Sequence, residues 1–348
     1  SQVETKADVQ ATAFSAQNAF FFSKMSKVVY SPKAEVQEYV QGDGTTTGLG
    51  FEHFYWFEPD SSVSARSAVD AIHDTESFVA ANDEMIMVVF RGTQEASDWV
   101  TNLSFLAKEI SAAFGLSESG PHVHWGFDDG VDTVWTGVGM HETVKRLYHE
   151  DGKNRKLFIT GHSLGGALAT IAAARLAFVD DMDIAALYTI GSPRVFDRSM
   201  AKCFDTKMNN GKALKDKYFR CRNNNDIVPR LVPPPYVHVG TEIYLDRFGH
   251  MGTTSILDRI LGRLSALLRL SFIDGTNDHS SSEYTRLFKQ IVINSKVSIV
   301  DKAKSLIKDA THKVIHKEKA KEQEEVIEEA KTAAIEASKE TLKVADVP

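Results

Sequence analysis

The segment GHSLGG at residues 161–166 fits the pattern G-x-S-x-G and lies between two runs of different character. Residues 156–160 form a short apolar run rich in strand formers, whereas residues 167–177 are rich in Ala and Leu at helical spacing. The sequence therefore predicts a strand, a sharp turn at Ser163 and a helix. Gly161 and Gly165 permit such a turn, because small residues two before and two after the serine avoid collisions. We expect an exposed hydroxyl beside the free amides of a helix N-terminus, an arrangement suited to acyl transfer.

Length, charge and cysteine content exclude several classes of protein. At 348 residues the chain is long enough for one large α/β domain or two smaller ones. A formal net charge of -7 argues against a nucleic-acid-binding surface. The two cysteines, Cys203 and Cys221, are too few for a disulfide scaffold and lack metal-ligand spacing, so we expect no metal or cofactor. One bridge between them is an alternative to the two buried thiols that we favour. Because no run of about 18 apolar residues occurs, we expect no transmembrane segment.

Strand-like and helix-like segments alternate along most of the chain. Ser77 to Ala81 and Met85 to Phe90 predict a strand pair, the second strand being covered on both faces because it is almost wholly apolar. Further strands are expected at residues 35–41, 50–58, 184–190 and 218–222, and further helices at residues 9–29, 127–149, 198–208 and 283–291. This alternation predicts a single three-layered α/β domain with a mostly parallel sheet over residues 1–295.

The composition changes at residue 296. From there the chain is rich in Lys, Glu and Ala and contains no aromatic residue or glycine, and apolar residues such as Val300, Ala303 and Leu306 recur every three or four positions. We therefore expect residues 296–348 to be a charged, amphipathic helical tail. A solvated helix packed loosely on the domain and an element that contacts a partner helix or another copy both stay open.

Ser163 needs a histidine to take its proton, and that histidine needs a carboxylate to fix its tautomer. In this type of fold the chain order is serine, acid, histidine. Asp226 fits the acid because it lies in a polar loop directly after the strand expected at 218–222, although such a loop also fits a simple turn. Asp197 is the second candidate, but it also fits the N-terminal cap of the helix that follows it.

Five histidines lie beyond Asp226, and two of them fall in the charged tail. His238 occupies an alternating, strand-like stretch where a half-buried sheet residue is the usual outcome. His250 lies in a glycine-flanked loop and is the main rival for the base. His279 lies in a polar loop just before the last expected helix, from which a side chain reaches back to the sheet edge. We therefore favour His279.

Six motifs occur in order: FRGT at 90–93, VHWGF at 123–127, GHSLGG at 161–166, GSPR at 191–194, NDIVP at 225–229 and DH at 278–279. Together they resemble the successive motifs of the class 3 lipases, the fungal triacylglycerol lipase family within the α/β-hydrolases, from about residue 10 to 295. The resemblance implies an α/β-hydrolase fold and a serine carboxylester hydrolase that acts on acylglycerols. It also implies Ser163 as nucleophile, Asp226 as acid and His279 as base.

The resemblance extends to the oxyanion hole and to a lid. Thr93 matches the family position that offers a backbone amide and a hydroxyl, and Leu164 offers the amide after the nucleophile. Many family members have serine at the Thr93 position, so its methyl group is expected to tune substrate fit. Residues 94–100 match the short lid of fungal lipases, with Trp99 as the large apolar residue, followed by Val100; a core position is the other interpretation of Trp99. A lid implies a substrate at a lipid–water interface.

Residues 255–272 depart from the family pattern. They carry a wide apolar face interspersed with arginines, which fits either the core or a lipid-contacting element beside the catalytic mouth. The fungal enzymes have no long helix that matches this segment, so the shape of the acyl pocket is expected to differ.

The motifs leave the substrate and compartment open. The same family contains phospholipases of the A1 type and feruloyl esterases, which the motif residues do not separate. A non-catalytic lipid-binding scaffold is the alternative from another class, although an intact triad argues against it. The resemblance favours secretion, and no signal peptide is visible in a sequence that begins at Ser1.

Overall fold

A computed structural model of the chain describes residues 6–43, 48–59, 75–93, 110–112, 121–149, 152–224, 226–232, 234–246, 250–252, 279–295 and 331–332. The expected lid residues Trp99 and Val100 and the apolar segment 255–272 lie outside these residues, as does the tail 296–348 apart from residues 331–332.

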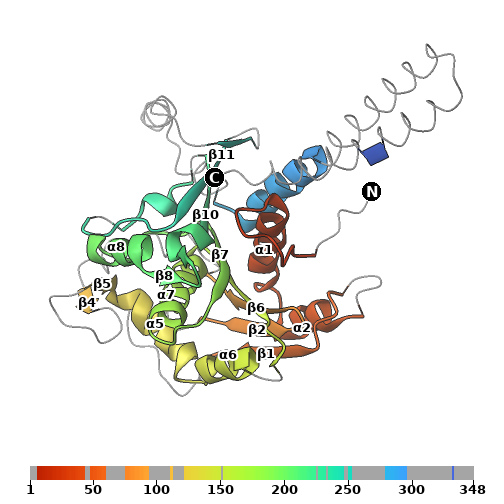
Figure 1. The fold of residues 1–348 in the computed structure, drawn as a ribbon, viewed down its shortest axis with the longest axis horizontal. Coiled ribbons are helices and arrows are strands. Elements are labelled where there is room, and N and C mark those ends of the chain that lie inside the picture. The colour runs from red at the N-terminus through yellow and green to blue at the C-terminus, as the bar shows by residue number, and fades with distance from the viewer. Residues whose placement is uncertain are drawn as a thin grey trace, which may run out of the picture.

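An eight-stranded sheet forms the centre of the molecule (Figure 1). Its strands, in spatial order, are β1 (His53–Phe57), β2 (Ser77–Ala81), β3 (Met85–Phe90), β6 (Lys156–His162), β7 (Ile184–Ile190), β10 (Tyr218–Asn223), β11 (Thr241–Leu245) and β12 (Met251–Gly252). The pairings from β3 to β11 are parallel, whereas β1 and β2 at one edge and β12 at the other pair antiparallel. The mostly parallel α/β sheet expected from the sequence is therefore confirmed.

Helices cover both faces of this sheet. One face packs against α1 (Ala16–Val28), α2 (Lys33–Gln41) and a helix over residues 281–295, and the other packs against α5 (Trp125–Trp135), α6 (Met140–His149), α7 (Leu164–Phe178) and α8 (Arg198–Thr206). The smaller described elements are two strand pairs, β4 (Ile110–Ala112) with β5 (His122–His124) and β8 (Met208–Asn209) with β9 (Lys212–Ala213), and two short 3₁₀ helices, η3 (Leu214–Lys217) and η4 (Val228–Arg230). The result is a three-layered α/β fold.

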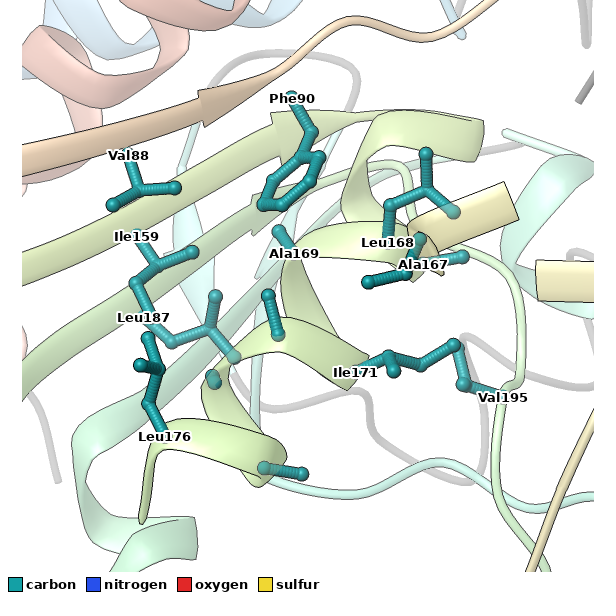
Figure 2. Packing of buried hydrophobic residues seen from close by; sticks show 14 of the residues in the cluster. Val88, Phe90, Ile159, Ala167, Leu168, Ala169, Ile171, Leu176, Leu187 and Val195 are labelled. Atoms are coloured by element: carbon teal, nitrogen blue, oxygen red, sulfur yellow. The ribbon is translucent and has the colours of Figure 1, made fainter. Parts of the chain in front are cut away.

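Alternating side chains of the central strands supply the two cores. In β3, Val88 and Phe90 pack with α7, whereas Met87 and Val89 pack with α1 on the opposite face. Figure 2 shows the first core, in which strand residues such as Ile159 meet apolar side chains of α7. Helix α7 is buried nearly all round, which explains why it is rich in small apolar residues and lacks a polar face.

The strand predicted at residues 35–41 is wrong. Residues Lys33–Gln41 form helix α2, which places Val36 and Val40 one turn apart, both fully buried against the core. The i, i+4 spacing of these two valines and the Pro32 that precedes the helix outweigh the strand preference of Val and Tyr.

Two predicted helices have different limits from those expected. The segment 127–149 forms two helices, α5 and α6, because Gly139 adopts a φ of +79° between them. The first helix begins at Ala16 rather than at residue 9, because the Ser15 side chain caps its first turn by accepting from the amide of Asn18.

Both cysteines are free thiols; Cys221 is buried and Cys203 is half-buried. Among the helices within the described ranges, none combines the length and the apolar character needed to cross a bilayer.

Candidate active site

Ser163 lies on a strained turn between β6 and α7. Its backbone has φ 59° and ψ −127°, a conformation that side chains rarely adopt, and its amide donates to the Ile190 carbonyl at 2.9 Å. A Cβ placed on Gly161 would lie 2.1 Å from the Gly165 carbonyl oxygen, and one on Gly165 would lie 2.3 Å from the Phe90 carbonyl oxygen. The turn therefore requires glycine at both positions, as the sequence predicts.

Three side chains from distant parts of the chain meet at this turn. The Ser163 hydroxyl lies 2.8 Å from Nε2 of His279. The Nδ1 atom of the same ring lies 3.0 Å from both carboxylate oxygens of Asp226. Because a carboxylate accepts, Nδ1 carries the ring proton and Nε2 presents a lone pair to the serine hydroxyl. The arrangement suits removal of the serine proton by His279.

The Asp226 carboxylate is fully buried and receives two further hydrogen bonds. The Tyr284 hydroxyl donates to Oδ2 at 2.6 Å, and the Val228 amide donates to Oδ1 at 2.9 Å. Burial and the neighbouring carboxylate raise the pKa of Tyr284 well above its usual value, so this phenol stays a donor. Together with His279, these donors satisfy a buried anion that would otherwise be costly.

Gly191 leaves the space in which the acid and the base meet. It has φ +61°, and a Cβ there would lie 2.7 Å from Asp226 Oδ2 and 2.9 Å from His279 Nδ1. The first glycine of the GSPR motif is thus required by both conformation and contact.

The serine is less accessible than the sequence suggests. We expected its hydroxyl to be exposed, yet the Ser163 side chain is only 1% exposed and His279 is 2% exposed. Among the described residues, the His279 ring lies against this hydroxyl, with 2.8 Å between its Nε2 and the serine oxygen.

The rival candidates lie in other environments. His250 is exposed and contacts Asp246, with 3.0 Å between Nδ1 and Oδ2. His238 is half-buried and donates to the Pro229 carbonyl. Asp197 caps α8 by accepting from the Met200 amide, the alternative role considered for it from the sequence.

The two expected oxyanion donors, Thr93 and Leu164, come after the paired parallel strands β3 and β6. Leu164 is the first residue of α7, where the initial amides of a helix lack intrahelical carbonyl partners. Thr93 follows the end of β3, and its hydroxyl is buried without a hydrogen-bond partner within the described ranges. A buried polar atom without a partner is unusual, and a developing oxyanion would provide one.

Sequence reasoning missed two contributors to the site. Tyr284 lies in the helix expected at residues 283–291, and its spacing from Leu287 and Phe288 fits a buried face, but nothing local reveals the hydroxyl contact to Asp226. His162, inside the GHSLGG motif, had no expected role, yet its Nε2 lies 2.6 Å from the His279 carbonyl oxygen.

His124 is a further buried histidine near the start of α5. Both ring nitrogens lack a hydrogen-bond partner within the described ranges, and the ring stacks on Phe127 with 4.3 Å between centroids. Burial lowers the pKa of His124 to about 4, so the ring is neutral at ordinary pH.

Comparison with known proteins finds lipases among the proteins with similar sequences. The family described as Lipase (class 3) matches residues 87–236, a range that includes Thr93, Ser163 and Asp226. The secreted mono- and diacylglycerol lipase 1 of Fusarium solani is 32% identical over 196 residues, which cover 54% of this chain and 53% of that protein. Phospholipase A1-II 6 of Oryza sativa subsp. japonica is 27% identical over 203 residues, which cover 51% of this chain and 47% of that protein. The chain thus spans about half the length of these relatives.

A solved structure shows the same fold. The triacylglyceride lipase of Rhizomucor miehei aligns with a TM-score of 0.52 at 23% identity, covering 71% of this chain and 94% of that one. The α/β-hydrolase fold that the sequence predicts is therefore confirmed. Residues 87–236 of the chain thus match the class 3 lipase family, and the relatives with similar sequences support that assignment.

Proposed function

We propose that this protein is a carboxylester hydrolase that cleaves acylglycerol esters through an acyl-enzyme at Ser163. One observation carries the proposal: His279 lies 2.8 Å from the Ser163 hydroxyl through one nitrogen and 3.0 Å from Asp226 through the other. Such a chain of contacts lets a serine act as a nucleophile near neutral pH. The names of the relatives, which include a mono- and diacylglycerol lipase, support an acylglycerol as the substrate.

The reaction proceeds in two halves. His279 takes the Ser163 proton as the serine oxygen bonds to the ester carbonyl carbon, and the proton then passes to the departing alcohol as the carbon–oxygen bond breaks. Water next attacks the acyl-enzyme, His279 takes its proton, and that proton returns to Ser163 as the fatty acid leaves. Asp226 keeps the His279 ring oriented and stabilises its charged form in both halves.

Thr93 and Leu164 stabilise the negative charge that develops on the substrate carbonyl oxygen. Support comes from the buried Thr93 hydroxyl, which has no hydrogen-bond partner among the described residues, and from the position of Leu164 at the start of α7. Each such donor is worth on the order of 3 kcal/mol in the transition state.

A phospholipase A1 activity at the same site is the second candidate. The rice relative named phospholipase A1-II 6 favours it, since its similarity covers about half of this chain. Cleavage of a phospholipid and of an acylglycerol requires the same serine chemistry, so the substrate-binding surface decides between them.

A substrate series tests the proposal. Hydrolysis of p-nitrophenyl esters of increasing chain length, a triglyceride, a diglyceride, a phosphatidylcholine and a methyl ferulate is measured with the wild-type chain and with Ser163→Ala. Acylglycerol cleavage should exceed the others in kcat/KM, and Ser163→Ala should lose about 10⁶-fold in kcat. A preference for phosphatidylcholine selects the second candidate, and preference for the ferulate selects an esterase. Lipid binding without hydrolysis of any ester would indicate a non-catalytic scaffold.

A further inference from the structure

Tyr30, which follows α1, joins three segments of the active site. Its hydroxyl lies 3.2 Å from Nδ1 of His162, at the end of β6. Its oxygen also accepts the backbone N–H of Gly92, beside Thr93. A Cβ on Gly92 would lie only 2.5 Å from the Tyr30 hydroxyl and 2.6 Å from the His162 carbonyl oxygen, so the three residues are closely packed.

His162 continues this connection to the base. Its Nε2 lies 2.6 Å from the carbonyl oxygen of His279, and the two imidazole rings lie 4.6 Å apart between centroids. A series of hydrogen bonds therefore runs from the Gly92 backbone, through the side chains of Tyr30 and His162, to the backbone of His279.

The direction of each hydrogen bond follows from the two ends of the path. The carbonyl of His279 only accepts, so His162 Nε2 carries a proton and donates it. Burial, and next the neighbouring His279, hold the pKa of His162 well below its usual value, so the ring is neutral and Nδ1 is an acceptor. The Tyr30 hydroxyl must then donate to Nδ1 while its oxygen accepts from Gly92. Every donor in the path thus has an acceptor.

Among the described residues, the regular sheet pairing stops short of the two segments that Tyr30 joins. The parallel pairing of β3 with β6 ends at Phe90 and Gly161, before either Thr93 or Ser163. Arg91 is held by an ion pair with Glu76 and lies over the Tyr30 ring at 5.6 Å. The next tie in the chain is the Gly92 contact to the Tyr30 hydroxyl.

We propose that Tyr30 and His162 are positioning residues, which hold the oxyanion donor Thr93 and the base His279 in register with Ser163. This inference rests on the proposed ester hydrolysis. The neutral His162 ring also places no charge beside His279 when that residue becomes an imidazolium. The pair touches no reacting atom and acts through Gly92 and the His279 carbonyl. Loss of the pair should slow the acyl-transfer step without weakening substrate binding.

The test compares Tyr30→Phe, His162→Phe, His162→Gln and the double variant Tyr30→Phe/His162→Phe in the full chain. Hydrolysis of p-nitrophenyl butyrate gives kcat and KM, with kcat expressed per active site titrated by a phosphonate ester. Loss of one hydrogen bond should lower kcat about 10-fold for Tyr30→Phe with KM unchanged. His162→Phe should lose roughly 10- to 100-fold, and His162→Gln should recover part of it, because the glutamine amide can still donate to the His279 carbonyl.

Two further measurements separate positioning from folding. The double variant should lose less than the product of the single losses, because both residues belong to one path. Tyr39→Phe is the matched control: its hydroxyl is also buried, has no hydrogen-bond partner within the described residues and lies on α2, so kcat should not change.

Distinct outcomes would overturn the proposal. Unchanged kcat per titrated site in Tyr30→Phe and His162→Phe would remove it, as would a rise in KM alone or losses that follow only the fraction of folded protein. A wild-type chain that hydrolyses no ester would overturn the proposed function together with this inference. An active wild type with fully active variants would overturn the inference alone.

Discussion

Ser163 lies on a turn shaped by its neighbours in sequence, whereas His279 is held by residues 53 and 117 positions away. The nucleophile turn depends on two glycines within three positions of the serine and on the start of α7. The base depends on Asp226 at its ring and on His162 at its carbonyl. A local motif can therefore specify the proposed nucleophile, whereas the proposed base is positioned by contacts between residues far apart in the chain.

The assignment of His279 as the base is tested most directly by replacing His279 itself. His279→Ala should lower kcat by about 10⁶-fold, because removal of one member of a coupled triad costs nearly as much as removal of all. His250→Ala is the matched variant, since His250 is exposed and contacts Asp246. Steady-state hydrolysis of p-nitrophenyl butyrate should show wild-type kcat for His250→Ala. Retained activity in His279→Ala together with loss in His250→Ala would reverse the assignment of the base.

The glycine requirement of the turn at Ser163 is tested by Gly165→Ala. The added methyl group would meet the Phe90 carbonyl oxygen and the Arg91 backbone, neither of which can move without shifting β3. A shift of about 1 Å at Ser163 should cost roughly 10²-fold in kcat. Gly252→Ala provides the control, because no atom lies within 4 Å of its added carbon in the described structure. Equal activity of the two variants would show that the turn tolerates a side chain.

Tyr284→Phe tests how much the long-range contacts around Asp226 contribute to the action of His279. This change removes the 2.6 Å hydrogen bond to Asp226 and leaves the Asn223 amide, which donates to the same hydroxyl at 2.7 Å, without its acceptor. A hydrogen bond to a charged group is worth about 1.5 to 3 kcal/mol, so kcat should fall roughly 10- to 100-fold. Stopped-flow measurement of the acylation burst should locate this loss in the first chemical step. Wild-type acylation would mean that His279 and the Val228 amide suffice to orient Asp226.

The smallest expected effect is the contribution of His124 to the free energy of unfolding at acidic pH. His124 has a folded pKa of about 4, below the value of about 6.5 expected when unfolded. Between these values the unfolded chain binds a proton that the folded chain does not, so the free energy of unfolding falls as pH drops from 6.5 towards 4. The slope is about 1.4 kcal/mol per pH unit from this residue.

His124→Phe keeps the stack on Phe127 and should reduce that slope in urea titrations at several pH values. His162 and His238 are also held neutral by burial, so the variant should retain part of the acid sensitivity. An unchanged slope would show that His124 contributes none of it.

The sequence predicted those features that depend on nearby residues. Strands Ser77–Ala81, Met85–Phe90 and Ile184–Ile190 were placed at their observed limits, because apolar runs of that length have few other outcomes. The β-branched and aromatic residues of segment 35–41 favour a strand, but the spacing of its two buried valines is helical and decides its structure. The order of Ser163, Asp226 and His279 identified side chains that do meet. The contacts of Tyr284, Tyr30 and His162 were missed, because hydroxyl and imidazole partners more than 50 positions apart leave no local pattern.

Covalent labelling of the wild-type chain with a fluorophosphonate tests the central claim most directly. The reagent resembles the tetrahedral intermediate and reacts with a serine activated by a histidine. Intact-mass measurement and peptide mapping should find a single adduct on Ser163, absent in Ser163→Ala and formed far more slowly in His279→Ala. An adduct on another residue, or ester hydrolysis that persists while Ser163 stays unlabelled, would contradict the account.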